Sequence, residues 1–104
     1  MKTRNYGQGI VLLEADSNYT ILHKTDGARE ISSYTMKWHI ERLGTEIILI
    51  RPIRKFCVNL QFLKAFNGNF FLMNHFKRPI PVSRRRKEQV ESQLHKYMNQ
   101  SNSN

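Results

Sequence analysis

The chain has 104 residues, 39% of them hydrophobic, and a formal net charge of +9 at neutral pH. This length provides one domain with a single modest core. The positive excess lies in the second half, because residues 1–50 carry six Lys and Arg against six Asp and Glu, whereas residues 51–104 carry eleven against two. A one-sided basic field favours a polyanionic partner, with nucleic acid ahead of an anionic membrane.

The sequence carries no signal for a membrane or for export. No apolar run approaches the length of a membrane span, and no signal-peptide pattern opens the chain. The single cysteine, Cys57, excludes an internal disulfide and suits a reducing compartment. We therefore expect a cytoplasmic protein without a membrane partner.

The first part of the chain predicts three strands. A polar lead-in is expected at residues 1–9, and residues 14–18 have the composition of a turn. Asp26-Gly27 is the signal of a type I′ hairpin turn. Apolar and β-branched runs predict the strands themselves at residues 10–13, 19–25 and 29–32.

A short helix is predicted over residues 35–43. Thr35 can cap its N-terminus, and Gly44 stands where helices commonly end. Trp38 lies off the apolar face of this helix, and core packing is the commoner role of a lone Trp. The apolar stripe at helical spacing comprises Met36, Ile40 and Leu43.

The second part of the chain predicts further strands and a last helix. Asn67-Gly68 signals another hairpin, a helix is expected from Ser83 to about Met98, and residues 99–104 form a polar tail. Asn59 is expected to satisfy buried backbone rather than to touch a ligand. Strands are expected at residues 46–50, 56–60, 62–66, 70–73 and 76–82. The expected core residues are Val58, Leu60, Phe62, Phe70, Leu72, Ile80 and Val82.

The cations of the second half gather in two clusters, each at a junction between predicted elements. The first comprises Arg51, Arg54 and Lys55. The second, residues 84–87, follows Ser83, which is a good N-cap for the last helix. Cations in a first helical turn oppose the helix dipole unless an anion lies in front of them, and Arg clusters bind phosphate. The charge pattern alone favours phosphate binding and a solvated basic turn about equally.

Enzymatic chemistry is a poor match for this sequence. The four histidines lack helical ligand spacing, so no metal site is expected, and there is no glycine-rich phosphate loop. Cys57, between Phe56 and Val58, is typical of a small buried hydrophobe rather than a nucleophile. Glu88 and Glu91 more simply balance nearby Arg than perform acid–base work. We therefore expect neither catalysis nor a cofactor.

Two motifs of the second half resemble those of a known family. Residues 50–60, I-R-P-I-R-K-F-C-V-N-L, are similar to the signature R-I-H-R-S-[FY]-L-V-N-L, and residues 80–85, I-P-V-S-R-R, match a later motif, I-P-V-S-R. Upstream, residues 13–23 resemble the family's first strand pair, and residues 35–43 resemble its S-L-x-x-L-E-x-x-L helix. Over about residues 10–90 the chain thus resembles the LytTR family of bacterial DNA-binding domains.

This resemblance implies a fold and a mode of binding. The fold is mainly β, with elongated antiparallel strands, a short mid-chain helix and a C-terminal helix over residues 10–98. Such domains lie along one face of double-stranded DNA and put loops into successive major grooves. They typically occupy paired direct repeats, so two copies side by side, as a homodimer on DNA, are expected. The chain has no room for a receiver domain, so we expect a stand-alone member without a phosphorylation switch of its own.

The resemblance also assigns contacts. The family's base-contacting positions fall on Asn18, Arg54 and Arg84. Taken alone, Asn18 would more simply be a turn asparagine. For Ser83, helix capping is the safer role. Phosphate contacts, which fix register and affinity, are expected from Arg51, Lys55, Ser83, Arg85, Arg86 and Lys87.

Three functions remain open at this point. The first is a sequence-specific DNA-binding transcription regulator. The second is a protein-interaction module that keeps the fold and modulates a partner regulator; Pro52 and Ile53 would suit that change, and Trp38 could be its exposed anchor. The third and weakest is a non-specific binder of RNA or of an anionic surface.

Overall fold

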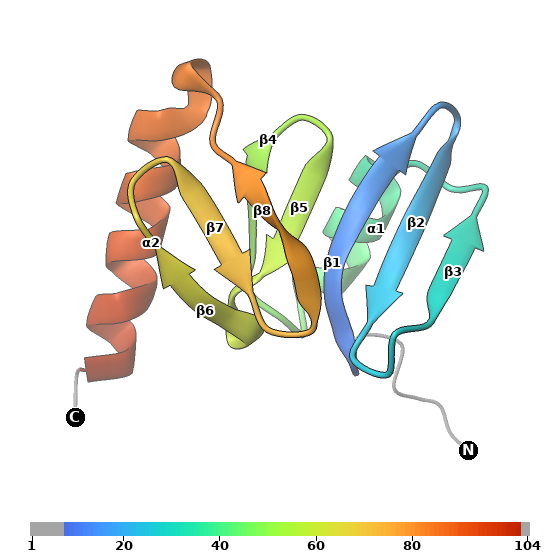
Figure 1. Ribbon diagram of the computed structural model, residues 1–104, viewed down its shortest axis with the longest axis horizontal. Coiled ribbons are helices and arrows are strands. Elements are labelled where there is room, and N and C mark those ends of the chain that lie inside the picture. The colour runs from blue at the N-terminus through green and yellow to red at the C-terminus, as the bar shows by residue number, and fades with distance from the viewer. Residues whose placement is uncertain (1–7, 103–104) are drawn as a thin grey trace.

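Two antiparallel sheets and two α-helices build a flat domain (Figure 1). The computed structural model describes residues 8–102, and the domain measures 35 × 34 × 24 Å. The mainly β fold with a mid-chain and a C-terminal helix is confirmed. The five-stranded sheet, in the order β3-β2-β1-β5-β4, contains β1 (Ile10–Asp16), β2 (Tyr19–Lys24), β3 (Arg29–Ser32), β4 (Leu49–Ile53) and β5 (Phe56–Asn59). The three-stranded sheet contains β6 (Leu63–Phe66), β7 (Phe70–Met73) and β8 (Phe76–Pro81). The helices are α1 (Met36–Leu43), α2 (Lys87–Asn102) and two 3-10 turns, η1 (Leu60–Phe62) and η2 (Arg84–Arg86).

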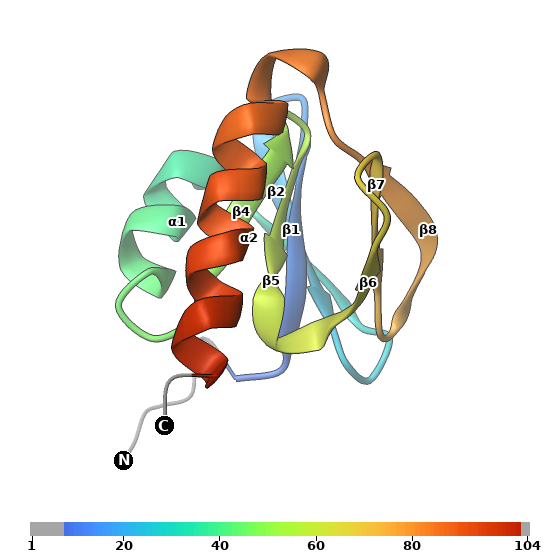
Figure 2. The same ribbon diagram turned by 90° about the vertical axis from the view of Figure 1, so that its left-hand side faces the viewer.

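The main core lies between the two sheets, and α2 closes one side of it (Figure 2). Leu12 and Val58 of the larger sheet meet Phe71 and Ile80 of the smaller one, together with Val90 of α2. All five side chains are buried. Burial of apolar area is the dominant favourable term in folding, so this layer is what joins the sheets and α2 into one unit.

A second core lies under α1, on the opposite face of the five-stranded sheet (Figure 2). Thr35 caps the helix as predicted, because its Oγ1 accepts from the backbone N–H of Trp38 at 3.1 Å. On β5, Cys57 packs in this second core whereas the next residue, Val58, packs in the main core. Successive side chains of a strand point to opposite faces, so a strand covered on both sides reads as a continuous apolar run.

The first strand is longer than predicted. The residues expected to begin a turn, from Glu14 onward, continue β1 as far as Asp16. Only Ser17 and Asn18 form the connection to β2, with Ser17 in the left-handed region at φ 55°. The expectation that Glu14 belongs to a turn is therefore wrong.

The strand that follows α1 begins later than predicted. Residues 46–48 are not strand, because the backbone N–H of Ile47 donates to the carbonyl of Leu43 at 2.9 Å and so prolongs the helical turn. β4 then runs from Leu49 through Pro52 without the expected interruption. β4 is an edge strand, so a proline in it, which has no backbone N–H, deprives no neighbouring strand of a hydrogen bond.

The first hairpin signal gives a hairpin with a different turn. The backbone N–H of Lys24 donates to the carbonyl of Ala28 at 2.9 Å, so the loop has three residues. Gly27 has φ 88°, whereas Asp26 does not have positive φ, which a type I′ turn requires of both residues. The type I′ prediction is wrong. A three-residue loop with glycine in the left-handed position is the alternative that hairpins use next most often.

The expected core is correct except on β7. Val58, Leu60 and Ile80 are buried, and Phe62 and Val82 are partly buried against the main core. Phe70 and Leu72 are wrong, because they are 41% and 36% exposed while their neighbours Phe71 and Met73 are buried. The pairing of Phe71 with Ile80 of β8 fixes which face of β7 points inward.

Trp38 lies outside both cores, so the expectation of core packing is wrong. Its ring stacks on that of Tyr34, with centroids 4.0 Å apart and an interplanar angle of 10°. The guanidinium of Arg42 lies 3.9 Å from the centroid of the same ring. Trp38 thus covers the outer surface of α1, between another aromatic ring and a cation.

At the ends of the chain, α2 continues to Asn102, beyond its expected end near Met98. Residues 1–7 of the expected lead-in lie outside the described part of the chain. No helix within the described residues is long and apolar enough to cross a membrane.

Candidate nucleic-acid interface

Three connections lie along one edge of the domain, the upper edge in Figure 1, and Figure 2 shows them at the same end. They are the β1–β2 turn at residues 17–18, the β4–β5 turn at residues 54–55, and the segment of residues 82–86 that joins β8 to α2. We call this surface the upper edge. Each of the three positions assigned to base contact, Asn18, Arg54 and Arg84, comes from a different one of these connections.

Backbone hydrogen bonds tie the three connections together. The N–H of Ala15, at the end of β1, donates to the carbonyl of Lys55 at 2.8 Å. The N–H of Ser83 donates to the carbonyl of Pro52 on β4 at 2.9 Å. The upper edge is therefore a single surface with fixed spacing, although its parts are far apart in the sequence.

The side chains of Asn18, Arg54, Arg84 and Arg85 are exposed. Within the described residues, none of these four makes a side-chain hydrogen bond, ion pair or cation–π contact. Three guanidinium groups and an amide along one edge thus have their donors free for an external anion or a base edge.

Two other arginines of the basic clusters are used inside the protein. The Nε and Nη2 atoms of Arg51 donate to the carbonyl of Arg54 at 3.0 and 2.5 Å, which closes the β4–β5 turn. Arg86 donates from Nη1 to the carbonyl of Arg51 at 3.4 Å. Burial and the nearby charge of Arg86 lower the pKa of the Arg51 guanidinium. Arg51 therefore holds the loop that presents Arg54.

Ser83 caps the helical segment that follows it. Its Oγ accepts from the backbone N–H of Arg86 at 3.3 Å, and its backbone is extended, as an N-cap requires. The expected capping role is confirmed, and donation by Ser83 to a phosphate stays a prediction. At the next position of the helix, Nζ of Lys87 donates to Oδ1 of Asn69 at 3.5 Å.

A hollow of about 580 Å³ opens on the upper edge between the β4–β5 turn and η2. Three arginines contribute to its wall, and it contains no acidic residue. A negatively charged group entering this hollow would therefore meet guanidinium donors from two separate loops. The lining residues are Ile53, Arg54, Ser83, Arg85, Arg86 and Gln89.

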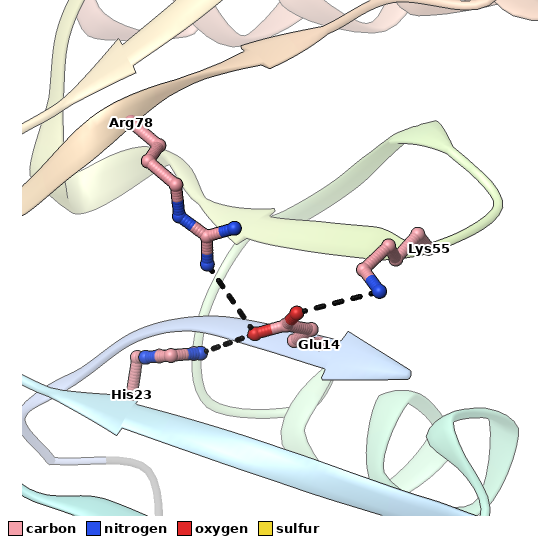
Figure 3. Close-up of polar contacts among 4 residues, drawn as sticks. All are labelled: Glu14, His23, Lys55 and Arg78. Atoms are coloured by element: carbon pink, nitrogen blue, oxygen red, sulfur yellow. Dashed lines mark hydrogen bonds and ion pairs between the residues drawn. The ribbon is translucent and has the colours of Figure 1, made fainter. Parts of the chain in front are cut away.

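A buried carboxylate contacts Lys55 of the β4–β5 turn (Figure 3). Glu14 of β1 is 7% exposed. Its Oε1 accepts from Nε2 of His23 at 2.8 Å and lies 3.7 Å from Nη2 of Arg78, while its Oε2 lies 3.6 Å from Nζ of Lys55. The three partners come from β2, β8 and the β4–β5 turn, so one carboxylate joins both sheets to an upper-edge loop.

The environment of Glu14 favours its charged form. Burial raises the pKa of the Glu14 carboxyl, but the hydrogen bond from His23 and the charges of His23, Arg78 and Lys55 lower that pKa by more. The net shift is downward from the ordinary value. The carboxylate is thus ionised and compensated at neutral pH.

The sequence pattern does not reveal the Glu14 cluster, because the composition of residues 14–18 predicts a turn there. The usable signal was strand alternation, since Glu14 lies two residues after Leu12 and so shares its inward face. An acidic residue on the inward face of a buried strand implies partners of opposite charge.

Comparison with protein families decides the identity of the fold. The model of the LytTr DNA-binding domain matches residues 7–95, which is most of the chain. This chain belongs to the LytTR family. The family consists of DNA-binding domains, so this LytTR domain binds DNA and acts in transcription regulation. No curated protein matches the chain.

Proposed function

We propose that this LytTR domain is a sequence-specific transcription regulator that reads duplex DNA with the loops of its upper edge. The observation that carries the proposal is that Asn18, Arg54 and Arg84 come from three separate connections, lie along one edge, and have no side-chain partner among the described residues. The domain is 35 Å long, close to the 34–36 Å of one helical turn of DNA. Loops spread along such an edge can enter successive major grooves.

The chemistry of the three side chains suits base readout. An arginine can donate two parallel hydrogen bonds to O6 and N7 of guanine, and an asparagine can pair with N6 and N7 of adenine. Lys55, which follows Arg54, and Arg85 and Lys87, which lie within three residues of Arg84, would neutralise phosphate beside these two arginines. Phosphate contacts fix the register of the domain, and base contacts specify the sequence.

Selection from random duplexes, followed by competition on the selected site, tests this proposal. Arg54→Ala and Arg84→Ala should each lower affinity for the selected site by about 1–3 kcal/mol and relax preference at one base pair, with much less effect on random duplex. Arg85→Ala is the matched control, because Arg85 is also exposed but has no assigned base, so the change should weaken binding to both duplexes by similar factors. Equal losses on both duplexes for Arg84→Ala would reduce the upper edge to an electrostatic clamp.

We also propose that two copies occupy paired direct repeats. One domain covers about one helical turn, so two reading edges placed head to tail would double the length of DNA that is read. A gel shift with one or two copies of the selected site checks this. On a duplex with two sites spaced by a helical turn, the second copy of the protein should bind with higher affinity than the first and give a second shifted band. Equal affinities for the two copies would show that they do not contact one another.

A specific surface favours the second function, a protein contact. Tyr34 is 54% exposed and stacks on Trp38, at the start of α1. Aromatic residues flanked by arginine are enriched at protein interfaces. If this surface serves a partner regulator, Trp38→Ala should leave DNA affinity unchanged and abolish regulation in cells.

A further inference from the structure

We propose that Glu14 is a positioning residue for base readout, and that it acts through the β4–β5 turn that carries Arg54. The inference rests on the proposed function, because it needs Arg54 to read a base. Glu14 itself is buried and cannot reach DNA. Its influence would come from holding the turn at one distance from the β1–β2 turn and from β8.

Lys55 attaches the β4–β5 turn to β1. Lys55 follows Arg54 in the β4–β5 turn, and its Nζ lies 3.6 Å from Oε2 of Glu14. Its carbonyl accepts the N–H of Ala15, the residue after Glu14, at 2.8 Å. Both the main chain and the side chain of Lys55 are therefore held by consecutive residues of β1. The Lys55–Glu14 contact therefore adds a side-chain tie to β1, beyond the Ala15 hydrogen bond and the Arg51 contacts that close the turn from within.

Glu14 is itself anchored by residues of β2 and β8. Nε2 of His23 lies 2.8 Å from Oε1, and His23 packs edge-on against Phe76 of β8 with centroids 5.0 Å apart. Arg78 reaches the same oxygen at 3.7 Å, and its guanidinium lies 5.0 Å from the Phe76 ring. The carboxylate is thus fixed from both sheets (Figure 3). A carboxylate that is held in this way can hold Lys55 in one position, whereas an acidic side chain that moves freely at the surface would not.

Burying the Glu14 carboxylate among charged partners has a free-energy cost. Replacing a buried ion cluster by apolar residues is often neutral or stabilising, so stability alone is weak grounds for burying Glu14. The cluster also ties Lys55, a cation of the upper edge, to a partner inside the domain. A need for precise geometry at the upper edge accounts for both the burial of Glu14 and its contact with Lys55. A donor misplaced by about an ångström loses a bidentate base contact.

The test uses the full chain with Glu14→Gln, which keeps the size and the hydrogen-bonding ability of the side chain but removes its charge. Glu30→Gln is the matched control, because Glu30 also pairs with a lysine, Lys24 at 3.5 Å, and lies on β3 of the same sheet. Both changes remove one negative charge, so both should strengthen binding to random duplex alike. The measurement is the ratio of affinities for the selected and the random duplex.

We expect Glu14→Gln to lower this ratio about tenfold, as loss of one good base contact would, and Glu30→Gln to leave it unchanged. In combination with Arg54→Ala, Glu14→Gln should lower the ratio no further, because the residue it positions is gone. A merely destabilised protein would lose active fraction and affect both duplexes equally. An unchanged ratio for folded Glu14→Gln, or full additivity with Arg54→Ala, would overturn the inference.

A second pair of variants keeps the inference testable if Glu14→Gln fails to fold. Arg78→Gln removes one anchor of the carboxylate, and the Arg78 side chain is 61% exposed, so folding should survive. Lys77→Gln is its control on the same strand. Arg78→Gln should lower the ratio about threefold, as partial loss of a base contact would, and Lys77→Gln should not. If wild-type protein fails to discriminate the two duplexes, the proposed function fails; if it discriminates and Arg78→Gln keeps the wild-type ratio, only this inference fails.

Discussion

Single residues of this domain behave according to their surroundings more than their type, and Cys57 shows this first. It is 1% exposed under α1, and burial raises the pKa of its thiol to about 12. The reactive thiolate is therefore almost absent near neutral pH. We expect a maleimide or disulfide reagent at pH 8 to label native protein at the rate of global unfolding, and urea-unfolded protein within seconds. Rapid labelling of native protein would indicate a redox-sensitive thiol instead.

The lowered pKa of Glu14 predicts how the free energy of unfolding depends on pH. Its carboxyl has a folded-state pKa below the ordinary value of 4.5. The folded state therefore binds this proton less readily than the unfolded state, so the stabilisation is present above the unfolded pKa and is lost as pH falls through the folded pKa. Urea unfolding from pH 7 down to pH 3 should show a steeper loss of stability in wild-type protein than in Glu14→Gln. Parallel curves would contradict the depressed pKa.

The second-half arginines separate into two groups that sequence patterns do not distinguish. Arg54 and Arg84 are exposed with free donors, whereas Arg51 donates twice to a backbone carbonyl. The family signature located all three, but a main-chain acceptor carries no sequence signal. The distinction depends on how tightly the β4–β5 turn closes, which only the folded backbone determines.

At the scale of elements, the junction between β8 and α2 depends on one cap. Ser83→Ala removes the oxygen that accepts the Arg86 N–H, and such losses cost about 1 kcal/mol of stability. Ser83→Thr keeps the oxygen and should cost much less. Chemical denaturation of the three proteins measures this. If Ser83 only caps the helix, the DNA affinity of folded Ser83→Ala should fall little, and a loss as large as that of Arg84→Ala would show a direct phosphate contact.

Element by element, the sequence predicted what local chemistry determines and failed where tertiary pairing decides. The caps at Thr35 and Ser83 and the hairpin at Asn67-Gly68 followed from side-chain oxygens and a glycine at φ 95°. On β7 every residue is apolar, so alternation cannot say which face is inward. The answer comes from the register with β8, where Phe71 faces Ile80.

The same division applies to the site. The basic clusters and the resemblance placed Arg54 and Arg84 at junctions, and the fold brings those junctions to one edge. The sequence did not reveal the cluster of Glu14, His23 and Arg78, because its members come from β1, β2 and β8 and meet only when the two sheets pack. Groups that act together across two sheets have no common spacing in the chain.

At the scale of the whole molecule, charge is arranged for a polyanion on one side. No Asp or Glu occurs between residues 51 and 87, a stretch that contains two of the three upper-edge connections. The β4–β5 turn and the segment of residues 82–86 therefore present their cations with no Asp or Glu inside either connection, and exposed acids lie only at the flanks of the edge, at Asp16 and Glu88. Counterion release from DNA should dominate affinity, and the salt dependence of binding reports how many cations take part.

The number of participating cations can be estimated from the contacts. Arg54, Arg84 and Arg85 are free, and Arg86 and Lys87 are held only at 3.4 and 3.5 Å by groups that a phosphate can replace. Lys55 is half exposed, so its ammonium can keep the contact with Glu14 while another of its donors meets a phosphate. Counting these six and excluding Arg51, the logarithm of the binding constant should fall with the logarithm of salt concentration at a slope of roughly −5.

Fluorescence anisotropy with random duplex at five salt concentrations measures this slope. Arg86→Ala should make it shallower by about one, because one phosphate contact is lost. Lys96→Ala is the control, since Lys96 is an exposed cation on α2, away from the upper edge, and its removal should leave the slope unchanged. A nearly flat response in wild-type protein would mean that the cations of the upper edge do not contact phosphate. Equal effects of Arg86→Ala and Lys96→Ala would mean that net charge, rather than the upper edge, governs binding.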